Sequence, residues 1–182
     1  MRGQGSIEYT FMLSGALLTI FLVLHTLAVI NPGPQEIINQ ISVEINEELT
    51  AYPNQNCDGI PNIVIYYVNY DAGGRFISDM FVLNDEYVII ANIWCKGVNL
   101  KGWRLTDEKD HVFTFPEIVI NPGDMITIHT GKGTNNETDL YWGNSLPVWN
   151  NEEDTAYLYS VDGTLIDKCS WSERGEGSIK CH

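Results

Sequence analysis

The sequence predicts an α+β chain with a long N-terminal hydrophobic helix, a short amphipathic helix, and then an all-β sandwich. Three observations carry this prediction. Residues 9–30 form an apolar run without Lys, Arg, Asp or Glu, residues 34–51 carry isoleucines at helical spacing, and the remainder alternates short β-type segments with turn signals. A chain of 182 residues divided in this way has room for one globular domain beside the helices.

The first helix is long enough to cross a bilayer. Residues 9–30 would form an α-helix about 33 Å long, and the hydrocarbon core of a bilayer is about 30 Å thick. The run contains only Thr, Ser, Gly and one His among its apolar residues, so it lacks the polar face of a soluble helix. We therefore expect membrane contact through residues 9–30.

The residues at the head of this run differ from a secretory signal. A cleaved signal peptide places its small-residue site after an apolar stretch of about 7–15 residues. Here the run is longer, and the small residue, Gly3, precedes it. Glu8 also stands at the start of the run, where a lone buried carboxylate costs several kcal/mol unless it is neutralised or paired. Glu8 therefore requires a partner.

The segment MRGQGSIEY resembles the class III signal peptide of archaeal type IV pilins, in which Q-x-S-x-E-Y opens the mature chain. The resemblance implies that a prepilin peptidase cuts between Gly3 and Gln4. It also implies that Glu8 and Tyr9 serve assembly, with Glu8 facing the N-terminal amine of a neighbouring subunit. An α-amine with a pKa of about 8 is mostly protonated at neutral pH and can neutralise a buried carboxylate.

A break and a second helix follow the run. Asn31-Pro32-Gly33-Pro34 opposes helix continuation, and Pro34 suits the first position of a new helix. Four apolar residues then recur every fourth position and form one stripe, which predicts an amphipathic helix at about 34–51: Ile37, Ile41, Ile45 and Leu49. The stripe packs either on neighbouring subunits or on the base of the head domain.

The part of the chain from about residue 62 onward is predicted to form short strands. Turn signals at Asp71-Ala72-Gly73-Gly74, Asn121-Pro122-Gly123 and Asp162-Gly163 separate segments rich in β-branched and aromatic residues. About seven strands without helical periodicity between them indicate an all-β sandwich. The predicted strands are 62–70, 87–94, 102–105, 111–115, 125–130, 155–160 and 164–169.

The same region resembles a prokaryotic lamin-tail domain from about Asn62 to Trp171. The matching pieces are Leu83-Asn84-Asp85-Glu86-Tyr87-Val88, Asn99-Leu100-Lys101-Gly102-Trp103, Phe115-Pro116, Asn121-Pro122-Gly123-Asp124, His129-Thr130-Gly131-Lys132-Gly133, Thr138-Asp139-Leu140-Tyr141-Trp142-Gly143, Val148-Trp149-Asn150-Asn151 and Asp154-Thr155-Ala156. The resemblance implies an immunoglobulin-like sandwich that acts in binding, without catalytic residues. From the residues themselves, Trp103 and Trp149 are predicted to pack in the core or at an edge of the sandwich rather than to bind a ligand. The Asn and Asp residues are predicted to form turns in which their side chains bond backbone groups.

The four cysteines predict disulfides. None stands in a C-x-x-C motif, so zinc has no sequence support, and an even number in an exported chain favours disulfide bonds. If the segments 62–70 and 87–94 pair antiparallel, Cys57 approaches Cys95, and Cys169 and Cys181 close the tail on the last strand. We favour this pairing, although the sequence does not fix the strand order.

Charge and motifs exclude several functions. The net charge of −14, from 24 acidic and 10 basic residues, disfavours nucleic acid as a partner. No G-x-S-x-G or comparable frame supports catalysis by the four histidines, and His129 reads as a structural histidine. Acidic turns at 107–110 and 152–154 could hold calcium but suit solvated loops better, so we assign no metal and no cofactor. Asn136 begins an N-glycosylation sequon in a polar loop.

Together the residue patterns and the resemblance to archaeal type IV pilins predict a pilin-like, non-enzymatic subunit of an archaeal surface filament. The expected parts are a signal peptide at 1–3, a filament and membrane helix at 4–30, a hinge with an amphipathic helix and linker at 31–59, and an immunoglobulin-like domain at 60–182. The precursor sits in the cell membrane, and the mature chain joins identical or related pilin subunits outside the cell, where adhesion to an unknown surface ligand is an expectation. The alternative is a monomeric, membrane-anchored extracellular binding module.

Overall fold

The computed structural model describes five stretches of the chain: residues 34–51, 57, 61–74, 78–172 and 177–182. The chain divides into two compact units, Met1–Ile41 and Ser42–His182. The predicted hydrophobic helix at 9–30 lies outside the described residues. In the part that is described, no helix combines the length and the apolar character needed to span a bilayer.

Helix α2 (Pro34–Ala51) confirms the predicted amphipathic helix at its predicted bounds. Pro34 occupies the first helical position, where its missing N–H leaves no hydrogen bond unmade. The isoleucines at 37, 41 and 45 are buried, whereas Glu36 and Glu44 are exposed. Spacing by four residues places the three isoleucines on one face, which gives the helix its amphipathic character.

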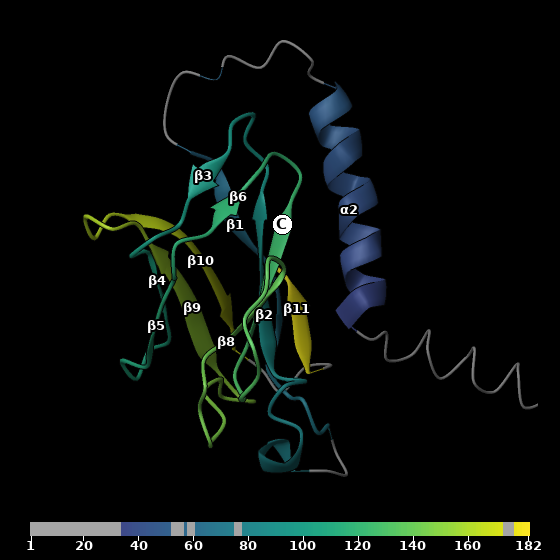
Figure 1. The fold of residues 1–182 in the computed structure, drawn as a ribbon. Coiled ribbons are helices and arrows are strands. Elements are labelled where there is room, and N and C mark those ends of the chain that lie inside the picture. Colours follow the sequence, from purple (N-terminus) through teal and green to yellow (C-terminus); the bar gives the residue numbers. More distant parts are fainter. Residues whose placement is uncertain (1–33, 52–56, 58–60, 75–77, 173–176) are drawn as a thin grey trace, which may run out of the picture. The chain divides into compact units, whose positions relative to one another are not determined.

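The β domain consists of two larger sheets and one two-stranded ribbon, as Figure 1 shows. The five-stranded sheet runs in the order β11 (Ser178–Lys180), β1 (Ile63–Asn69), β2 (Tyr87–Asn92), β7 (Met125–His129), β8 (Asp139–Tyr141). The four-stranded sheet runs in the order β10 (Leu165–Trp171), β9 (Asp154–Tyr159), β4 (Arg104–Thr106), β5 (Val112–Thr114). The ribbon pairs β3 (Val98–Asn99) with β6 (Val119–Ile120), and a short 3-10 helix, η1 (Asp79–Phe81), precedes β2.

The core lies between the two larger sheets. Side chains alternate across each strand, so Val88 and Ile90 of β2 and Leu105 of β4 point inward and are fully buried in one contiguous apolar cluster. Trp103 and Trp149 belong to the same cluster and are 6% and 2% exposed. Their predicted role in core packing is therefore confirmed, and the all-β sandwich predicted from the strand pattern is confirmed with it.

The β domain contains more strands than the sequence predicted. The seven predicted strands correspond to β1, β2, β4, β5, β7, β9 and β10 with small shifts of their ends, but the described residues hold eleven strands. The four that the sequence did not indicate are β3, β6, β8 and β11, which are two or three residues long. Segments this short cannot show a period-two alternation. β8 and β11 become strands by pairing with the longer β7 and β1, and β3 and β6 become strands by pairing with each other. One of them, β8, runs parallel to β7.

Strand pairing gathers one set of loops at the end of the sandwich where β1 finishes, which we call the far end. Asn69, the last residue of β1, pairs with Tyr87 at the start of β2, and Tyr87 pairs with His129 at the finish of β7. The short 3-10 helix η1 lies at this end, at the bottom of Figure 1. The described loop residues of the far end are 70–74, 78–86, 107–111, 130–132 and 142–153.

Candidate functional site

The residues predicted to serve processing and assembly lie outside the described part of the chain. Gly3 and Gln4, at the predicted cleavage site, and Glu8 and Tyr9, at the head of the hydrophobic run, all precede Pro34, where the description begins. Their roles stay predictions from the sequence. The structure bears instead on the cysteines, the sequon, the histidines and the surface of the β domain.

The two predicted disulfides are present with the favoured pairing. Cys57 is bonded to Cys95 and Cys169 to Cys181. The Cys57–Cys95 pairing follows from the antiparallel contact of β1 with β2, which brings the segment before β1 close to the segment after β2. Cys181 follows β11 and joins β10 in the opposite sheet, so this bond ties the C-terminal edge strand to the sandwich.

Replacing both Cys169 and Cys181 with alanine is expected to lower the free energy of unfolding of the β domain by about 3 kcal/mol. The bond closes a loop of 12 residues, and a loop of that size loses about this much chain entropy on cross-linking. The shift is measured by guanidinium chloride unfolding monitored by tryptophan fluorescence. A midpoint equal to that of the wild type would contradict the expectation, provided that mass spectrometry finds the wild-type bond intact.

The predicted glycosylation residue, Asn136, is exposed in the loop before β8. Its side-chain oxygen accepts hydrogen bonds from the backbone N–H groups of Thr138 and Asp139, each at 2.7 Å, and from the Thr138 hydroxyl at 3.1 Å. The asparagine thus forms the type of turn in which a side chain bonds the backbone two or three residues on. Residues 132–138 of this loop are all exposed to solvent.

His129 is a structural histidine, as predicted. Its Nδ1 lies 2.6 Å from the carbonyl oxygen of Asn84, and its Nε2 lies 3.2 Å from Oδ1 of Asp139. The imidazole also stacks on Tyr141, with ring centroids 4.9 Å apart. Both ring nitrogens are therefore engaged in contacts that join β7 to β8 and to the loop before β2.

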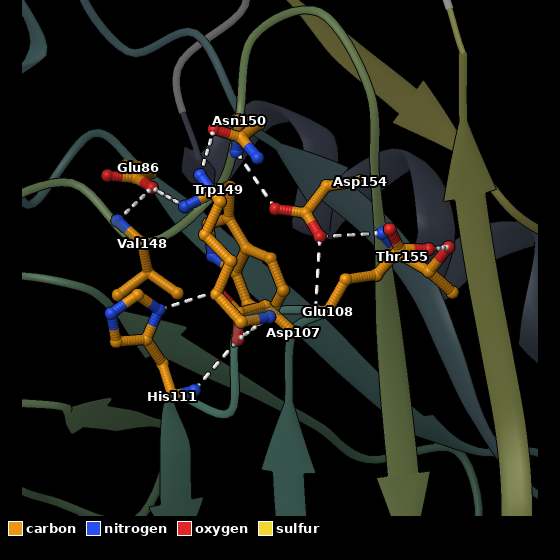
Figure 2. Close-up of polar contacts among 10 residues, drawn as sticks. Glu86, Asp107, Glu108, His111, Val148, Trp149, Asn150, Asp154 and Thr155 are labelled. Carbon is orange, nitrogen blue, oxygen red and sulfur yellow. Dashed lines mark hydrogen bonds and ion pairs between the residues drawn. The ribbon is translucent and has the colours of Figure 1, made fainter.

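The fully buried carboxyl group of Glu86 joins the loop before β9 to the start of β2 (Figure 2). Its Oε1 accepts hydrogen bonds from the backbone N–H groups of Val148 at 3.0 Å and Trp149 at 2.6 Å, while Oε2 has no partner among the described residues. Burial raises the pKa of Glu86 to about 8, although the two N–H donors act in the opposite direction. The nearby Asp79 and Asp154 carboxylates push the pKa further upward.

Asp154 organises the same loop from its other side. This residue is 2% exposed, and its carboxylate accepts hydrogen bonds from the backbone N–H groups of Asn150 at 3.0 Å, Thr155 at 2.8 Å and Glu108 at 3.3 Å. Figure 2 places it beside Trp149, between the loop before β9 and the turn after β4. A carboxylate with three backbone donors holds two separate loops in fixed positions.

Asp107 fixes the turn between β4 and β5. Its Oδ1 accepts hydrogen bonds from the backbone N–H groups of Lys109 at 3.0 Å and His111 at 2.8 Å, and its Oδ2 lies 2.6 Å from Nδ1 of His111. The prediction that the two acidic turns are solvated is therefore wrong for Asp107 and Asp154, which are 4% and 2% exposed because their carboxylates bind backbone N–H groups inside the loops. It is confirmed for the exposed residues Glu108, Asp110, Glu152 and Glu153. Among the described residues, no three His, Cys, Asp or Glu side chains converge as metal ligands.

Exposed apolar side chains stand on the far end. Phe81 is 84% exposed, Leu146 is 62% exposed and Met80 is 57% exposed. A cleft of about 530 Å³ opens beside Phe81 and is lined by residues 80–85, 131–132 and 144–145. Large exposed apolar groups of this kind are typical of contact surfaces. Sequence reasoning missed them because Met80-Phe81-Val82-Leu83 has the composition of a buried segment.

Backbone hydrogen bonds to the buried side chains of Glu86, Asp107 and Asp154 hold the loops of the far end, and apolar side chains are exposed beside them. Such an arrangement suits contact with a partner. No curated protein matches the sequence. The family model described as Lamin Tail Domain matches residues 58–173, which is more than half of the chain and covers most of the β domain. The immunoglobulin-like sandwich and the family match agree, and the chain therefore belongs to the Lamin Tail Domain family.

Proposed function

We propose that the protein is a type IV pilin-like structural subunit of an archaeal cell-surface filament that displays its lamin-tail domain as an adhesive head. The observation that carries the proposal is the order of residues at the N-terminus: Gly3 and Gln4 precede Glu8, and Glu8 precedes the apolar run at 9–30. A lamin-tail domain is a binding or structural module, which suits the head of such a subunit.

Assembly would proceed by exchange of one apolar environment for another. A prepilin peptidase would cut the membrane-held precursor after Gly3, and residues 9–30 would move laterally from lipid into a bundle of identical helices. Contacts of this head-to-tail kind do not close, so they propagate into a filament. Glu8 would set the register, because a subunit displaced by one step leaves a buried carboxylate without its amine partner.

The far end supports a contact role for the head. The chain enters the β domain ahead of Ile63, and β1 then runs to Asn69, so the far end is the side of the domain opposite this point of connection. Phe81, Met80 and Leu146 are exposed on that side. In a filament, surfaces opposite the connection to the helix are those free to meet an external surface, and exposed apolar residues there favour adhesion.

Replacing Glu8 with alanine is expected to abolish or strongly reduce filaments while membrane insertion of the precursor stays intact. The substitution removes the partner of the neighbouring amine but makes the run at 9–30 no less apolar. Filaments are counted by electron microscopy, and insertion is measured by membrane fractionation. Glu36→Ala, which removes an exposed carboxylate from α2, is the matched control and is expected to assemble normally. Normal filaments from the Glu8 variant would overturn the assembly role.

The competing function is a monomeric, membrane-anchored binding module, which shares the helix and the head. Mass spectrometry of the N-terminal peptide of the mature protein separates the two. A mature chain that starts at Gln4 supports the pilin-like subunit. An intact Met1, or a cut beyond Ile30, supports the anchored or released module instead.

A further inference from the structure

The outer face of the four-stranded sheet carries an aromatic and polar surface. On β9, Ala156 and Leu158 are fully buried in the core, whereas Tyr157 and Tyr159 alternate with them and are partly exposed. On the neighbouring β4, Arg104 is exposed and pairs directly with Tyr159. Since successive side chains point to opposite faces of a strand, these three residues share the face turned away from the core.

A cleft of about 560 Å³ opens on this face. The rings of Tyr157 and Tyr159 line it side by side, with centroids 6.1 Å apart and planes inclined by 25°. Glu108 and Asp110, in the turn between β4 and β5, line the same cleft. Its volume falls in the range of roughly 300–1,000 Å³ that is typical of ligand pockets.

Of the three carboxylates that line this cleft, Asp107 lies 2.6 Å from His111, whereas Glu108 and Asp110 lack a cationic partner among the described residues. Glu108 accepts one hydrogen bond, from the neutral hydroxyl of Thr155 at 2.9 Å, and Asp110 makes no hydrogen bond or ion pair in the described part of the chain. Arg104 does not pair with them, because its guanidinium lies over the Tyr159 ring, 5.7 Å from the centroid. Asp110 is also held in a left-handed conformation, with φ of 64°, which fixes the turn that presents both carboxylates.

We infer that this cleft binds the cationic head of a lysine or arginine side chain on a partner protein. Carboxylates beside aromatic faces are the groups that recognise ammonium and guanidinium ions, through charge-assisted hydrogen bonds and cation–π contacts. Arg104 already makes such a cation–π contact with Tyr159 inside the protein, and among the described residues no cation lies over the ring of Tyr157. The net charge of −14 disfavours a second copy of the chain and any other acidic partner at this site.

The inference goes beyond the proposed function, because it concerns the β domain alone and holds whether or not the chain assembles. The test uses the full chain in detergent micelles and a fluorescently labelled Gly-Lys-Gly-Lys-Gly peptide, with binding measured by anisotropy. We expect the double variant Glu108→Gln/Asp110→Asn to bind the peptide at least roughly tenfold more weakly. Tyr157→Ala is expected to weaken binding by a similar factor, whereas Tyr157→Phe, which retains the aromatic face, is expected to bind like the wild type.

A matched control separates this site from general attraction to an acidic protein. Glu117→Gln/Glu137→Gln removes two exposed carboxylates outside the cleft and changes the net charge equally, so binding is expected to stay within about twofold of the wild type. Equal weakening by the control pair and the cleft pair would overturn the inference. So would equal binding of the same peptide with acetylated lysines, or unchanged binding by Tyr157→Ala. Tryptophan emission establishes that each variant is folded.

Discussion

Replacing Glu86 with glutamine is expected to make the β domain more stable than the wild type at pH 8 and to change its stability little at pH 5. The folded-state pKa of about 8 lies above the ordinary value of 4.5, so between these pH values the folded protein keeps a proton that the unfolded chain releases. The contribution to stability is complete below about pH 4.5 and is lost as the pH rises to about 8. The loss reaches roughly 4 kcal/mol.

Glutamine reproduces the shape of the protonated side chain. Its amide oxygen can accept the N–H groups of Val148 and Trp149, which now donate to Oε1 of Glu86. The side chain no longer titrates, so the variant should lose the fall in stability that Glu86 causes. At pH 8 the wild type must place a negative charge in a buried site near Asp79 and Asp154, whereas the variant does not.

Guanidinium chloride unfolding at pH 5, 6.5 and 8 measures this effect. All five tryptophans follow residue 93 in the sequence, so their emission reports on the β domain rather than on the N-terminal helix. Glu137→Gln, at an exposed position, is the control and should keep the wild-type profile. Parallel pH profiles for Glu86→Gln and the wild type would rule out a buried, protonated Glu86 at neutral pH.

The elements that sequence reasoning located were those whose signal is local. Pro34 and the isoleucines at every fourth position lie within one short segment and predict α2 by themselves. The bounds of α2 agree with the prediction. Long strands such as β1 and β9 can also be predicted from the sequence, because they are rich in β-branched and aromatic residues. The short strands β8 and β11 acquire their structure from β7 and β1, which lie elsewhere in the sequence, so no local pattern could identify them.

The candidate site was predicted less well, for a related reason. The cysteine pairing followed from antiparallel contact of two long strands, which the sequence indicated. Glu86 stands in Asn84-Asp85-Glu86, which has the composition of an exposed turn, and its burial depends on donors 62 and 63 residues away. Phe81 shows the opposite case, because an apolar residue that looks buried is 84% exposed. Burial of single residues is decided by tertiary contacts that composition does not reveal.

Replacing Trp149 with alanine is expected to cost about 3–5 kcal/mol of the free energy of unfolding, because it opens a cavity in the middle of an aromatic row. Trp149 is 2% exposed, and its ring contacts Trp142 at a centroid distance of 5.8 Å and Trp171 at 6.0 Å, both edge-on. Tyr70 extends the row beyond Trp171, and Phe113 extends it beyond Trp142. Loss of the central ring removes contacts from both halves.

Phenylalanine at position 149 is expected to cost much less, about 1–2 kcal/mol. It keeps an aromatic ring in the row and removes the Nε1–H group, which is buried without a hydrogen-bond partner among the described residues. Near-UV circular dichroism and guanidinium chloride unfolding measure the two variants. Equal losses for Trp149→Phe and Trp149→Ala would mean that the site depends on the full indole rather than on ring packing.

The same phenylalanine variant separates the two roles of residue 149. Its backbone N–H still donates to Glu86, because the substitution changes only the side chain. The stability of Trp149→Phe should therefore fall between pH 5 and pH 8 with the slope of the wild type, displaced by a constant amount. Stability measured against pH tests this directly, and a flattened slope would indicate that the indole itself keeps Glu86 protonated by excluding water from it.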